Sequence, residues 1–425
     1  MQNLSFGPLS KRDQAVIWHP FTQHYIEPKS IAIRTGKGCI LTDELGNEII
    51  DAISSWWVSI HGHGHPYLAQ KLHEQALQLE QVIFAGFTHE PAVSLSERLL
   101  AKLPANFEKL FFSDNGSTAV EVAIKMALQY FFNQGNTKKR KILAFEDAYH
   151  GDTFGAMSLG APSAFNAPFQ DMLFEVEFLP SPLHETACLQ AFEDKMKDAE
   201  SFAAFIFEPL VQGAGGMKIY SAEFLDKLIQ LAQKNNVFCI ADEIMTGFGR
   251  LGKWFALDYL SHKPDIICLS KGLTGGMMAM GVTACSNEVF DAFLSSDRMK
   301  TFFHSHSFTG NPLACAVANA SLDLLEQATY ETALQSIHQS HLAWAEKMKS
   351  TTKFSNIRVF GTILAMEYVT NETSGYLNSN RDYIYEKCLS EGVLLRPLGN
   401  TIYLMPPYVI TQKELQKIYQ VIENL

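Results

Sequence analysis

Between residues 110 and 290, short apolar runs alternate with longer amphipathic segments. The runs are rich in β-branched and aromatic residues, as is typical of strands buried on both faces. The runs that we expect to form strands are Leu110–Phe112, Ile142–Phe145, Ala203–Phe207, Val237–Ala241, Ile266–Leu269 and Val282–Cys285. Because segments with helical periodicity separate them, the pattern predicts an α/β fold with a mostly parallel sheet covered by helices. In such sheets the reactive residues follow the carboxyl ends of the strands.

The alternation of apolar runs and amphipathic segments changes in character beyond residue 290. Residues 316–349 have helical periodicity, and the remainder of the chain alternates strand-like runs with helices, which predicts a smaller α+β domain. Near the amino terminus, Ile31–Arg34 and Gly38–Leu41 predict a hairpin that packs against this smaller domain. We therefore expect residues 1–60 and 321–425 to form a small domain and residues 61–320 to form a large one.

Composition and charge narrow the class of protein. The 425 residues are 47% hydrophobic and 19% charged, which suits large apolar cores and excludes disorder of the whole chain. The net charge is 34 − 45 = −11, which argues against nucleic acid or an anionic membrane as a partner. Residues 1–16 lack the apolar core of a secretory signal, and no run reaches the roughly 18 apolar residues of a membrane span. The seven cysteines are widely spaced, which favours a reducing cytoplasm.

A lysine follows one of the predicted strands. Ile266–Leu269 leads into Ser270, Lys271 and Gly272, so a buried strand delivers one amine to its carboxyl end. An isolated lysine in this place usually begins a surface loop. Lys271 is not isolated, because the preceding strand, Val237–Ala241, ends in Asp242. That carboxylate could merely cap a turn.

Together the two side chains suit one kind of chemistry. A pyridoxal phosphate enzyme needs a lysine that holds the cofactor as a Schiff base and a carboxylate that keeps the pyridine nitrogen protonated. One strand-crossover-strand unit separates Asp242 from Lys271, which predicts that both lie at the same edge of the sheet. Lys271 is the candidate catalytic residue, and both bind the cofactor.

Two further strand ends fit this hypothesis. After Leu110–Phe112 the chain reads Gly116, Ser117, Thr118, at the start of a segment with a helical apolar face. Amides and the Ser117 hydroxyl at a helix start can hold a phosphate, while Thr118 and Glu121 also fit a capping box. After Ile142–Phe145 comes Tyr149, which could stack on a pyridine ring or be ordinary core.

Two other clusters invite different interpretations. His61, His63 and His65 could ligate zinc, but glycines separate them and no cysteine or acidic residue is near in the sequence, so we favour a turn and predict no metal. The basic run Lys138–Lys141 could be a phosphate patch, but we interpret it as a solvated turn.

The ordered motifs resemble the class III aminotransferases of the fold-type I pyridoxal phosphate superfamily over nearly the whole chain. The motifs are Gly116-Ser117, Tyr149-His150-Gly151, Glu208-Pro209, Asp242-Glu243, Ser270-Lys271-Gly272 and Gly310-Asn311-Pro312. This resemblance implies a seven-stranded sheet in the large domain, pyridoxal 5'-phosphate as cofactor and a homodimer whose subunits share their active sites. It also implies that Gly116 and Ser117 bind the phosphate and that Tyr149 stacks on the ring and contacts substrate.

A second set of motifs resembles one subgroup of the class III aminotransferases. Trp18-His19-Pro20, Ser54-Ser55-Trp56-Trp57 and residues 149–153 and 212–217 are similar to the members that aminate 8-amino-7-oxononanoate with S-adenosylmethionine, a step of biotin biosynthesis. Carried over by position, Trp56 and Trp57 would line the substrate pocket, and Arg396 would bind a substrate carboxylate. Electron-rich indole rings can attract a sulfonium cation, and arginine suits carboxylates, although paired tryptophans are often core and Arg396 could lie on the surface.

The chain departs from the family's pattern at two places. Phe21 follows His19-Pro20 where a tyrosine is usual, and Ser305-His306-Ser307 replaces a more usual Gly-x-Thr. The resemblance implies that His306 and Ser307 reach a partner subunit's cofactor and that Ser305 contacts substrate. Lysine as the amino donor, another ω-amino acid as substrate, and an aminomutase of the same fold remain alternatives. A cofactor-binding regulator would need a DNA-binding module, for which the length and acidic charge leave no room.

Overall fold

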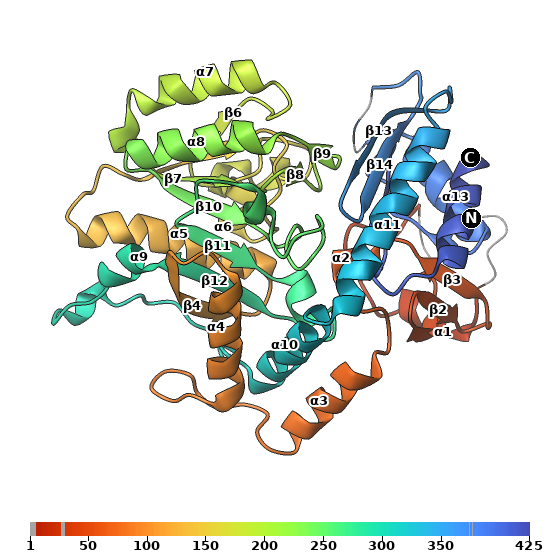
Figure 1. Ribbon diagram of the computed structural model, residues 1–425, viewed down its shortest axis with the longest axis horizontal. Coiled ribbons are helices and arrows are strands. Elements are labelled where there is room, and N and C mark those ends of the chain that lie inside the picture. The colour runs from red at the N-terminus through yellow and green to blue at the C-terminus, as the bar shows by residue number, and fades with distance from the viewer. Residues whose placement is uncertain (1–5, 27–29, 374, 376) are drawn as a thin grey trace. The chain divides into compact units, whose positions relative to one another are not determined.

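The computed structural model describes residues 6–26, 30–373, 375 and 377–425 (Figure 1). The chain divides into two compact units, of which unit 1 comprises residues 1–66 and 335–425 and unit 2 comprises residues 67–334. Helix α11, Ala328–Lys347, crosses the later boundary. Among the described residues, no helix is long and apolar enough to cross a membrane.

Within the described residues, unit 2 is built on a seven-stranded sheet in the order β4-β12-β11-β10-β7-β5-β6. Its strands are β4 (Phe107–Ser113), β5 (Lys141–Phe145), β6 (Val176–Leu179), β7 (Phe202–Phe207), β10 (Phe238–Asp242), β11 (Ile266–Leu269) and β12 (Gly281–Ser286). Only β12 runs antiparallel to its neighbours, so the sheet is mostly parallel, as the sequence pattern predicts. Every residue of β7, β10, β11 and β12 is buried, which explains why their sequences are continuous apolar runs.

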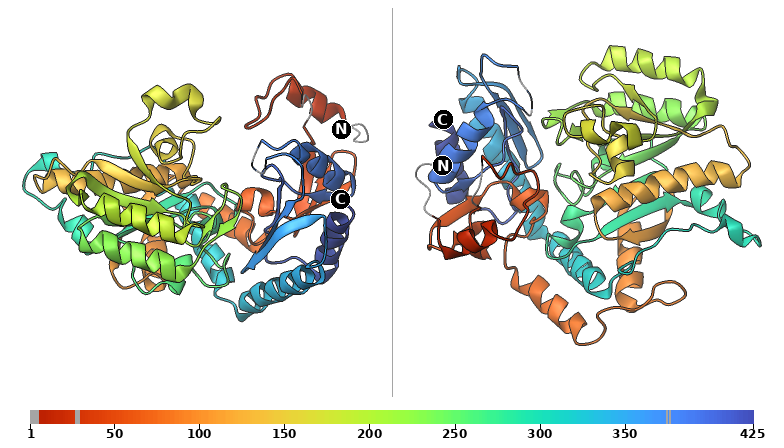
Figure 2. Two further views of the ribbon diagram at one scale, coloured as in Figure 1. Left: turned by 90° about the horizontal axis from the view of Figure 1, so that it is seen from above. Right: turned by 180° about the vertical axis from the view of Figure 1, so that it is seen from behind.

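Helices cover both faces of this sheet (Figures 1 and 2). Helix α5 (Gly116–Asn133) packs across β4, β7, β10, β11 and β12, whereas α7 (Glu185–Met196) and α8 (Ala222–Lys234) lie side by side over the other face. The apolar face predicted for α5, which includes Val120, Ala123 and Ala127, is fully buried. Two polar atoms of the sheet bind the Ala119 carbonyl: the Thr283 hydroxyl at 2.8 Å and the Cys268 thiol at 3.5 Å. The start of α5 is therefore fixed to the strands.

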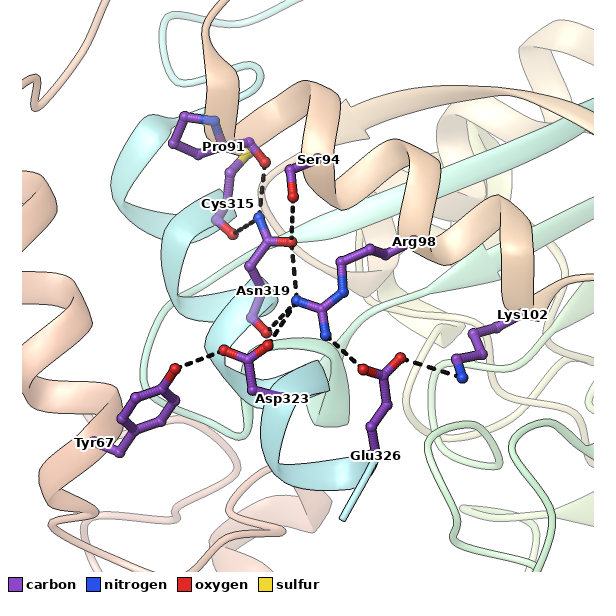
Figure 3. A network of polar contacts seen from close by, with 9 residues as sticks. All are labelled: Tyr67, Pro91, Ser94, Arg98, Lys102, Cys315, Asn319, Asp323 and Glu326. Atoms are coloured by element: carbon purple, nitrogen blue, oxygen red, sulfur yellow. Dashed lines mark hydrogen bonds and ion pairs between the residues drawn. The ribbon is translucent and has the colours of Figure 1, made fainter.

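Unit 2 contains further helices and a pair of short strands. They are α3 (Pro66–Ala76), α4 (Glu90–Lys102), α6 (Phe154–Ser158), α9 (Asn287–Asp291), α10 (Pro312–Leu325) and the paired strands β8 (Val211–Gln212) and β9 (Lys218–Ile219). Figure 3 shows that α4 and α10 are joined by polar contacts. Arg98 on α4 lies 2.9 Å from both Asp323 and Glu326, and the Tyr67 hydroxyl donates to Asp323 at 2.7 Å.

Unit 1 joins the two ends of the chain. A four-stranded sheet has the order β1-β2-β3-β15, and a three-stranded sheet has the order β13-β14-β16. The elements of unit 1 are α1 (Pro8–Gln14), β1 (Ile33–Lys37), β2 (Ile40–Asp43), β3 (Glu48–Asp51), α2 (Ser54–Trp57), β13 (Phe354–Phe360), β14 (Ile363–Tyr368), α12 (Asn380–Ser390), β15 (Val393–Leu394), β16 (Thr401–Leu404) and α13 (Gln412–Glu423). The predicted hairpin is β1 and β2, and β3 pairs in parallel with β15 from the carboxyl-terminal part.

The structure corrects three local predictions. The helical pattern of residues 316–349 forms two helices, α10 and α11, which are interrupted after Leu325. Lys139 is not in a solvated turn: it is 2% exposed, and its ammonium group donates to the carbonyls of Ala199, Phe202 and Asn236. Those three acceptors match the three ammonium hydrogens, which makes burial of a lysine tolerable.

The third correction concerns the start of α5. Its N-cap is Asn115, whose side chain accepts from the Thr118 amide, while the Thr118 hydroxyl accepts from the Asn115 amide. The capping box is thus Asn115 with Thr118, not Thr118 with Glu121. Glu121 instead accepts from the Thr153 hydroxyl and from the Ala156 amide, at 2.5 and 3.1 Å.

Candidate active site

The two residues singled out for cofactor chemistry lie at the ends of neighbouring parallel strands. Asp242 is the last residue of β10 and is paired in register with Cys268 of β11. Lys271 follows β11 by two residues, in a short 3-10 helix that begins where the strand ends. Its φ of 44° is in the left-handed region, which is uncommon for a residue with a side chain. The predicted shared edge of the sheet is confirmed.

The surroundings of Lys271 lower the pKa of its amine. Burial lowers the pKa of its amine to about 8, although the carboxylates of Asp242 and Glu208 act in the opposite sense. The positive charge of Arg250, itself fully buried, lowers the pKa of Lys271 further. A lysine with a pKa near 8 is partly uncharged at neutral pH and can act as a nucleophile or a proton carrier.

Asp242 is held by a histidine from another strand end. His150 Nδ1 lies 2.7 Å from Asp242 Oδ2, and both side chains are buried. The Ile244 amide donates to the other oxygen, Oδ1, at 3.1 Å. His150 Nε2 is buried and has no hydrogen-bond partner in the structure. The histidine orients the carboxylate and leaves it acceptor capacity for a further donor.

Glu208 follows β7 and organises the neighbouring loop. Its two carboxylate oxygens accept from the amides of Tyr149 and Gly213, at 3.1 and 2.8 Å. Burial raises the pKa of Glu208 to about 7, a shift that the His150 charge opposes and the Asp242 charge increases. Tyr149 is 38% exposed, so it is within reach of a ligand. Burial and the neighbouring Asp152 raise the pKa of the Tyr149 phenol.

The start of α5 meets the loop that carries Tyr149. The Asp152 amide donates to the Ser117 hydroxyl oxygen at 3.3 Å. A methyl group at Gly151 would collide with Ser117, and the backbone there has a φ of 132°, so this position requires glycine. A methyl group at Gly116 would lie 2.9 Å from the Ile244 side chain, which would have to move. Gly116 and Ser117 occupy the first turn of α5, where backbone amides have no partner within the helix. An anion at this place would meet those amides and the positive end of the helix dipole.

The predicted partner-facing segment lies elsewhere in unit 2. Ser305 and Ser307 are exposed, and the Ser307 carbonyl accepts from Gln81 at 2.5 Å. The Phe308 amide donates to His306 Nδ1, while His306 Nε2 is buried and has no hydrogen-bond partner in the structure. The hydrogen bonds described for this segment lie within it and to Gln81.

Unit 1 carries the remaining predicted residues. The guanidinium carbon of Arg396 lies 4.7 Å from the centroid of the Trp56 ring, and Trp56 is 39% exposed. Arg396 Nη2 is buried and has no hydrogen-bond partner in the structure, so it can receive an anionic ligand. Phe21 packs edge-on against Trp56 at 5.5 Å between centroids. Trp57 lies in the core, where its indole nitrogen donates to the Tyr403 hydroxyl at 3.0 Å.

Sequence reasoning missed His150, Glu208 and Arg250 as parts of this electrostatic cluster. His150 and Glu208 lay within motifs that served only to recognise the family. Glu208 directly follows one predicted strand and His150 lies in the loop after another, and this position beyond strand ends was the available signal.

A family model for class III aminotransferases matches residues 22–425. The chain belongs to this family. The class III aminotransferases are pyridoxal phosphate enzymes, and their fold is the one described for both units.

Individual class III aminotransferases agree with this assignment. An enzyme of Synechococcus elongatus named adenosylmethionine-8-amino-7-oxononanoate aminotransferase is 47% identical, covering 96% of this chain and 98% of that protein. An enzyme of the same name from Helicobacter pylori is 39% identical over 96% of this chain and 95% of its own length. The crystal structure of the enzyme of that name from Methanocaldococcus jannaschii is 33% identical, with a TM-score of 0.93 over 98% of both chains.

Proposed function

We propose that this enzyme transfers an amino group from S-adenosylmethionine to 8-amino-7-oxononanoate and forms 7,8-diaminononanoate, a step of biotin biosynthesis. The observation that carries the reaction type is the pair of adjacent strand ends at which Lys271 and the His150-supported Asp242 lie. The names of full-length relatives support the two substrates.

We also propose that the chain binds pyridoxal 5'-phosphate, because its residues fit each part of that molecule. The first turn of α5 offers amides and the Ser117 hydroxyl to a phosphate, and Gly151 beside it is a position where no side chain fits. Asp242 offers a buried carboxylate to a protonated pyridine nitrogen, and Lys271 offers an amine to an aldehyde. Bound pyridoxal phosphate supplies an aldehyde carbon that carries the amino group from donor to acceptor and a ring that accepts electrons during the transfer.

The protein's own groups then do two things. Lys271 Nζ, whose pKa is lowered to about 8, can take up a proton from a substrate carbon and release it again near neutral pH. Asp242 would hold the ring nitrogen of a bound cofactor, and His150 orients that carboxylate through one of its oxygens. Glu208 fixes the backbone at Tyr149, which we propose as the residue that stacks on the ring.

For substrate binding we propose the Trp56 and Arg396 pair of unit 1. Stacking on the indole fixes the guanidinium plane, and the buried unpartnered Nη2 can bind a carboxylate, which the donor and the acceptor both carry. The partly exposed Trp56 ring can attract a sulfonium cation. Trp57, whose buried indole donates to the Tyr403 hydroxyl, would anchor the turn that carries Trp56.

We further propose a cytoplasmic homodimer in which Ser305, His306 and Ser307 serve the partner's active site. Unit 2 exposes several large apolar side chains near this segment in the sequence, Met299, Phe303 and Phe308, as well as Ile83 and Phe87. Such a concentration of exposed apolar residues is typical of an interface. Sedimentation equilibrium should give a species of twice the 47.5 kDa chain mass, and a monomer at micromolar concentration would contradict the dimer.

Turnover with defined donors tests the reaction. Purified protein with pyridoxal phosphate and 8-amino-7-oxononanoate is incubated separately with S-adenosylmethionine and with lysine, and 7,8-diaminononanoate is measured by mass spectrometry. Product with S-adenosylmethionine is the expected result. Product with lysine alone would assign the other donor, and no product with either donor would contradict the proposed acceptor.

A further inference from the structure

The segment that carries Trp56 has an unusual backbone. Ser54, Ser55 and Trp57 have φ angles of 51°, 60° and 70°, although none of them is glycine. Side chains disfavour this left-handed region, so the surrounding structure has to impose it. Trp56 stands between the strained residues, with φ −125° and ψ 60°. Its orientation therefore depends on whatever holds the turn.

A buried carboxylate holds the first half of the turn. Asp51, the last residue of β3, is completely buried. Its Oδ1 accepts from the Ile53 amide at 3.1 Å, and its Oδ2 accepts from the Ser55 amide at 2.6 Å. These two bonds from backbone amides to one carboxyl group fix the direction in which the chain leaves the strand.

A histidine fixes Asp51 in turn. His63 Nε2 lies 2.8 Å from Asp51 Oδ2, and the His63 backbone exchanges two hydrogen bonds with Gly38, at 3.1 and 2.8 Å. Gly36 allows this close approach, because a methyl group there would lie 2.7 Å from the Cβ atom of His63. The β1 to β2 hairpin thus anchors the imidazole, and the imidazole anchors the carboxylate.

The same turn is also tied to β16 and to the residue that follows it. The Ser54 hydroxyl donates to the Met405 carbonyl at 2.8 Å, and the Trp57 indole donates to Tyr403. Trp56 lies between these anchors, is 39% exposed, and faces Arg396.

We infer that Asp51, anchored by His63, is a positioning residue that holds the Trp56 ring against Arg396 and so sets the affinity for substrate carboxylates. This inference rests on the proposed function, because it assigns Trp56 and Arg396 to substrate. It adds two residues that touch neither substrate nor cofactor.

Binding of an unreactive carboxylate tests the inference apart from catalysis. Nonanoate, a straight-chain monocarboxylate, is titrated calorimetrically into the full-length protein loaded with pyridoxal phosphate. Asp51→Asn should weaken binding about tenfold, because a small misplacement of a recognition group has large effects. His63→Gln should weaken it about threefold, since the backbone bonds to Asp51 remain. If the Asp51 variant does not fold, the His63 variant decides.

Asp43→Asn is the matched control. Asp43 is another buried carboxylate of the same sheet and holds the β2 to β3 turn by accepting from the amides of Leu45 and Asn47. This variant should lose thermal stability while its affinity for nonanoate stays within about twofold of wild type. Equal weakening by Asp43→Asn and Asp51→Asn, unchanged affinity in the Asp51 and His63 variants, or no binding to wild type would overturn the inference.

Kinetics provide the second readout. In Asp51→Asn the KM for 8-amino-7-oxononanoate should rise about tenfold while kcat changes less than about threefold and the cofactor absorbance stays unchanged. A fall in kcat with unchanged KM would contradict positioning. The wild-type rate tests the proposed function separately, because the calorimetric contrast between Asp51 and Asp43 does not depend on turnover.

Discussion

Unit 2 contains two clusters of charged side chains that differ mainly in their exposure to solvent. At the strand ends, Asp242 and Glu208 are buried together with His150, and burial moves the pKa of Lys271 and of Glu208 toward neutrality. Between α4 and α10 (Figure 3), Arg98, Asp323 and Glu326 form ion pairs of similar length while remaining partly exposed.

The two clusters differ in how far solvent reaches their charged groups rather than in how many charges they contain. Water screens the pairs between the helices, so they contribute little energy and serve to dock α4 on α10. At the strand ends the charged side chains are buried, so each charge acts strongly on its neighbours and shifts their pKa. Substitutions in the two clusters should therefore differ in kind as well as in size.

The largest effect is expected from Lys271→Ala. Without the amine the protein cannot hold pyridoxal phosphate covalently, so the absorbance band of the lysine-bound cofactor and turnover should both disappear. Spectroscopy and a product assay measure both. Lys253→Ala is the control, because that lysine contacts the Asp258 carbonyl and the Tyr259 ring and should be dispensable. Full activity of the Lys271 variant would refute its assignment.

Asp242→Asn should have the next largest effect. An amide cannot keep the pyridine nitrogen protonated, so we expect bound cofactor with a rate lowered roughly a hundredfold. Cofactor content and kcat are measured together. The same change at Asp323, in the exposed cluster between α4 and α10, should leave kcat within about twofold of the wild-type value. Equal rates for wild type and Asp242→Asn would remove Asp242 from its proposed role.

The lowered pKa of Lys271 predicts a pH dependence. The amine reacts with an aldehyde only when uncharged, and its pKa is about 8 in the folded chain. Capture of pyridoxal phosphate by the cofactor-free protein should accelerate about tenfold per pH unit below that value and level off above it. Stopped-flow absorbance between pH 6 and about 10 follows this reaction. A rate that still rises steeply beyond pH 9 would indicate an ordinary, solvent-exposed lysine.

In the exposed cluster between α4 and α10, Arg98→Ala should lower the stability of the fold and leave catalysis unchanged. Removing the arginine breaks its contacts with Asp323 and Glu326, which are partly exposed, so we expect a loss of about 1 kcal/mol in the free energy of unfolding. Urea denaturation measures the loss, and kcat should not change. A large fall in kcat would show that the two clusters are coupled.

The smallest effect is expected at Phe21, whose ring packs against Trp56 in unit 1. Phe21→Tyr adds only a hydroxyl to a side chain that is already partly exposed, so catalytic efficiency should stay equal or rise by about twofold. Steady-state kinetics with 8-amino-7-oxononanoate measure it. A large loss would mean that the pocket is adapted to the phenyl ring.

These residues also show how far the sequence could be interpreted. Lys271 and Asp242 were predictable because parallel strands end at one edge, so that local apolar runs locate distant side chains together. The contact between His150 and Asp242 joins residues 92 positions apart, and no local spacing encodes it. The same is true of Lys139, whose three acceptors lie 60, 63 and 97 positions away, and of Asp51, whose partner His63 lies beyond a strained turn.

Chemical trapping of the cofactor tests the central claim most directly. The protein loaded with pyridoxal phosphate is reduced with borohydride, digested, and mapped by mass spectrometry. The account predicts a single pyridoxyl adduct, on the peptide that contains Lys271. An adduct on another lysine, or none at all, would contradict it.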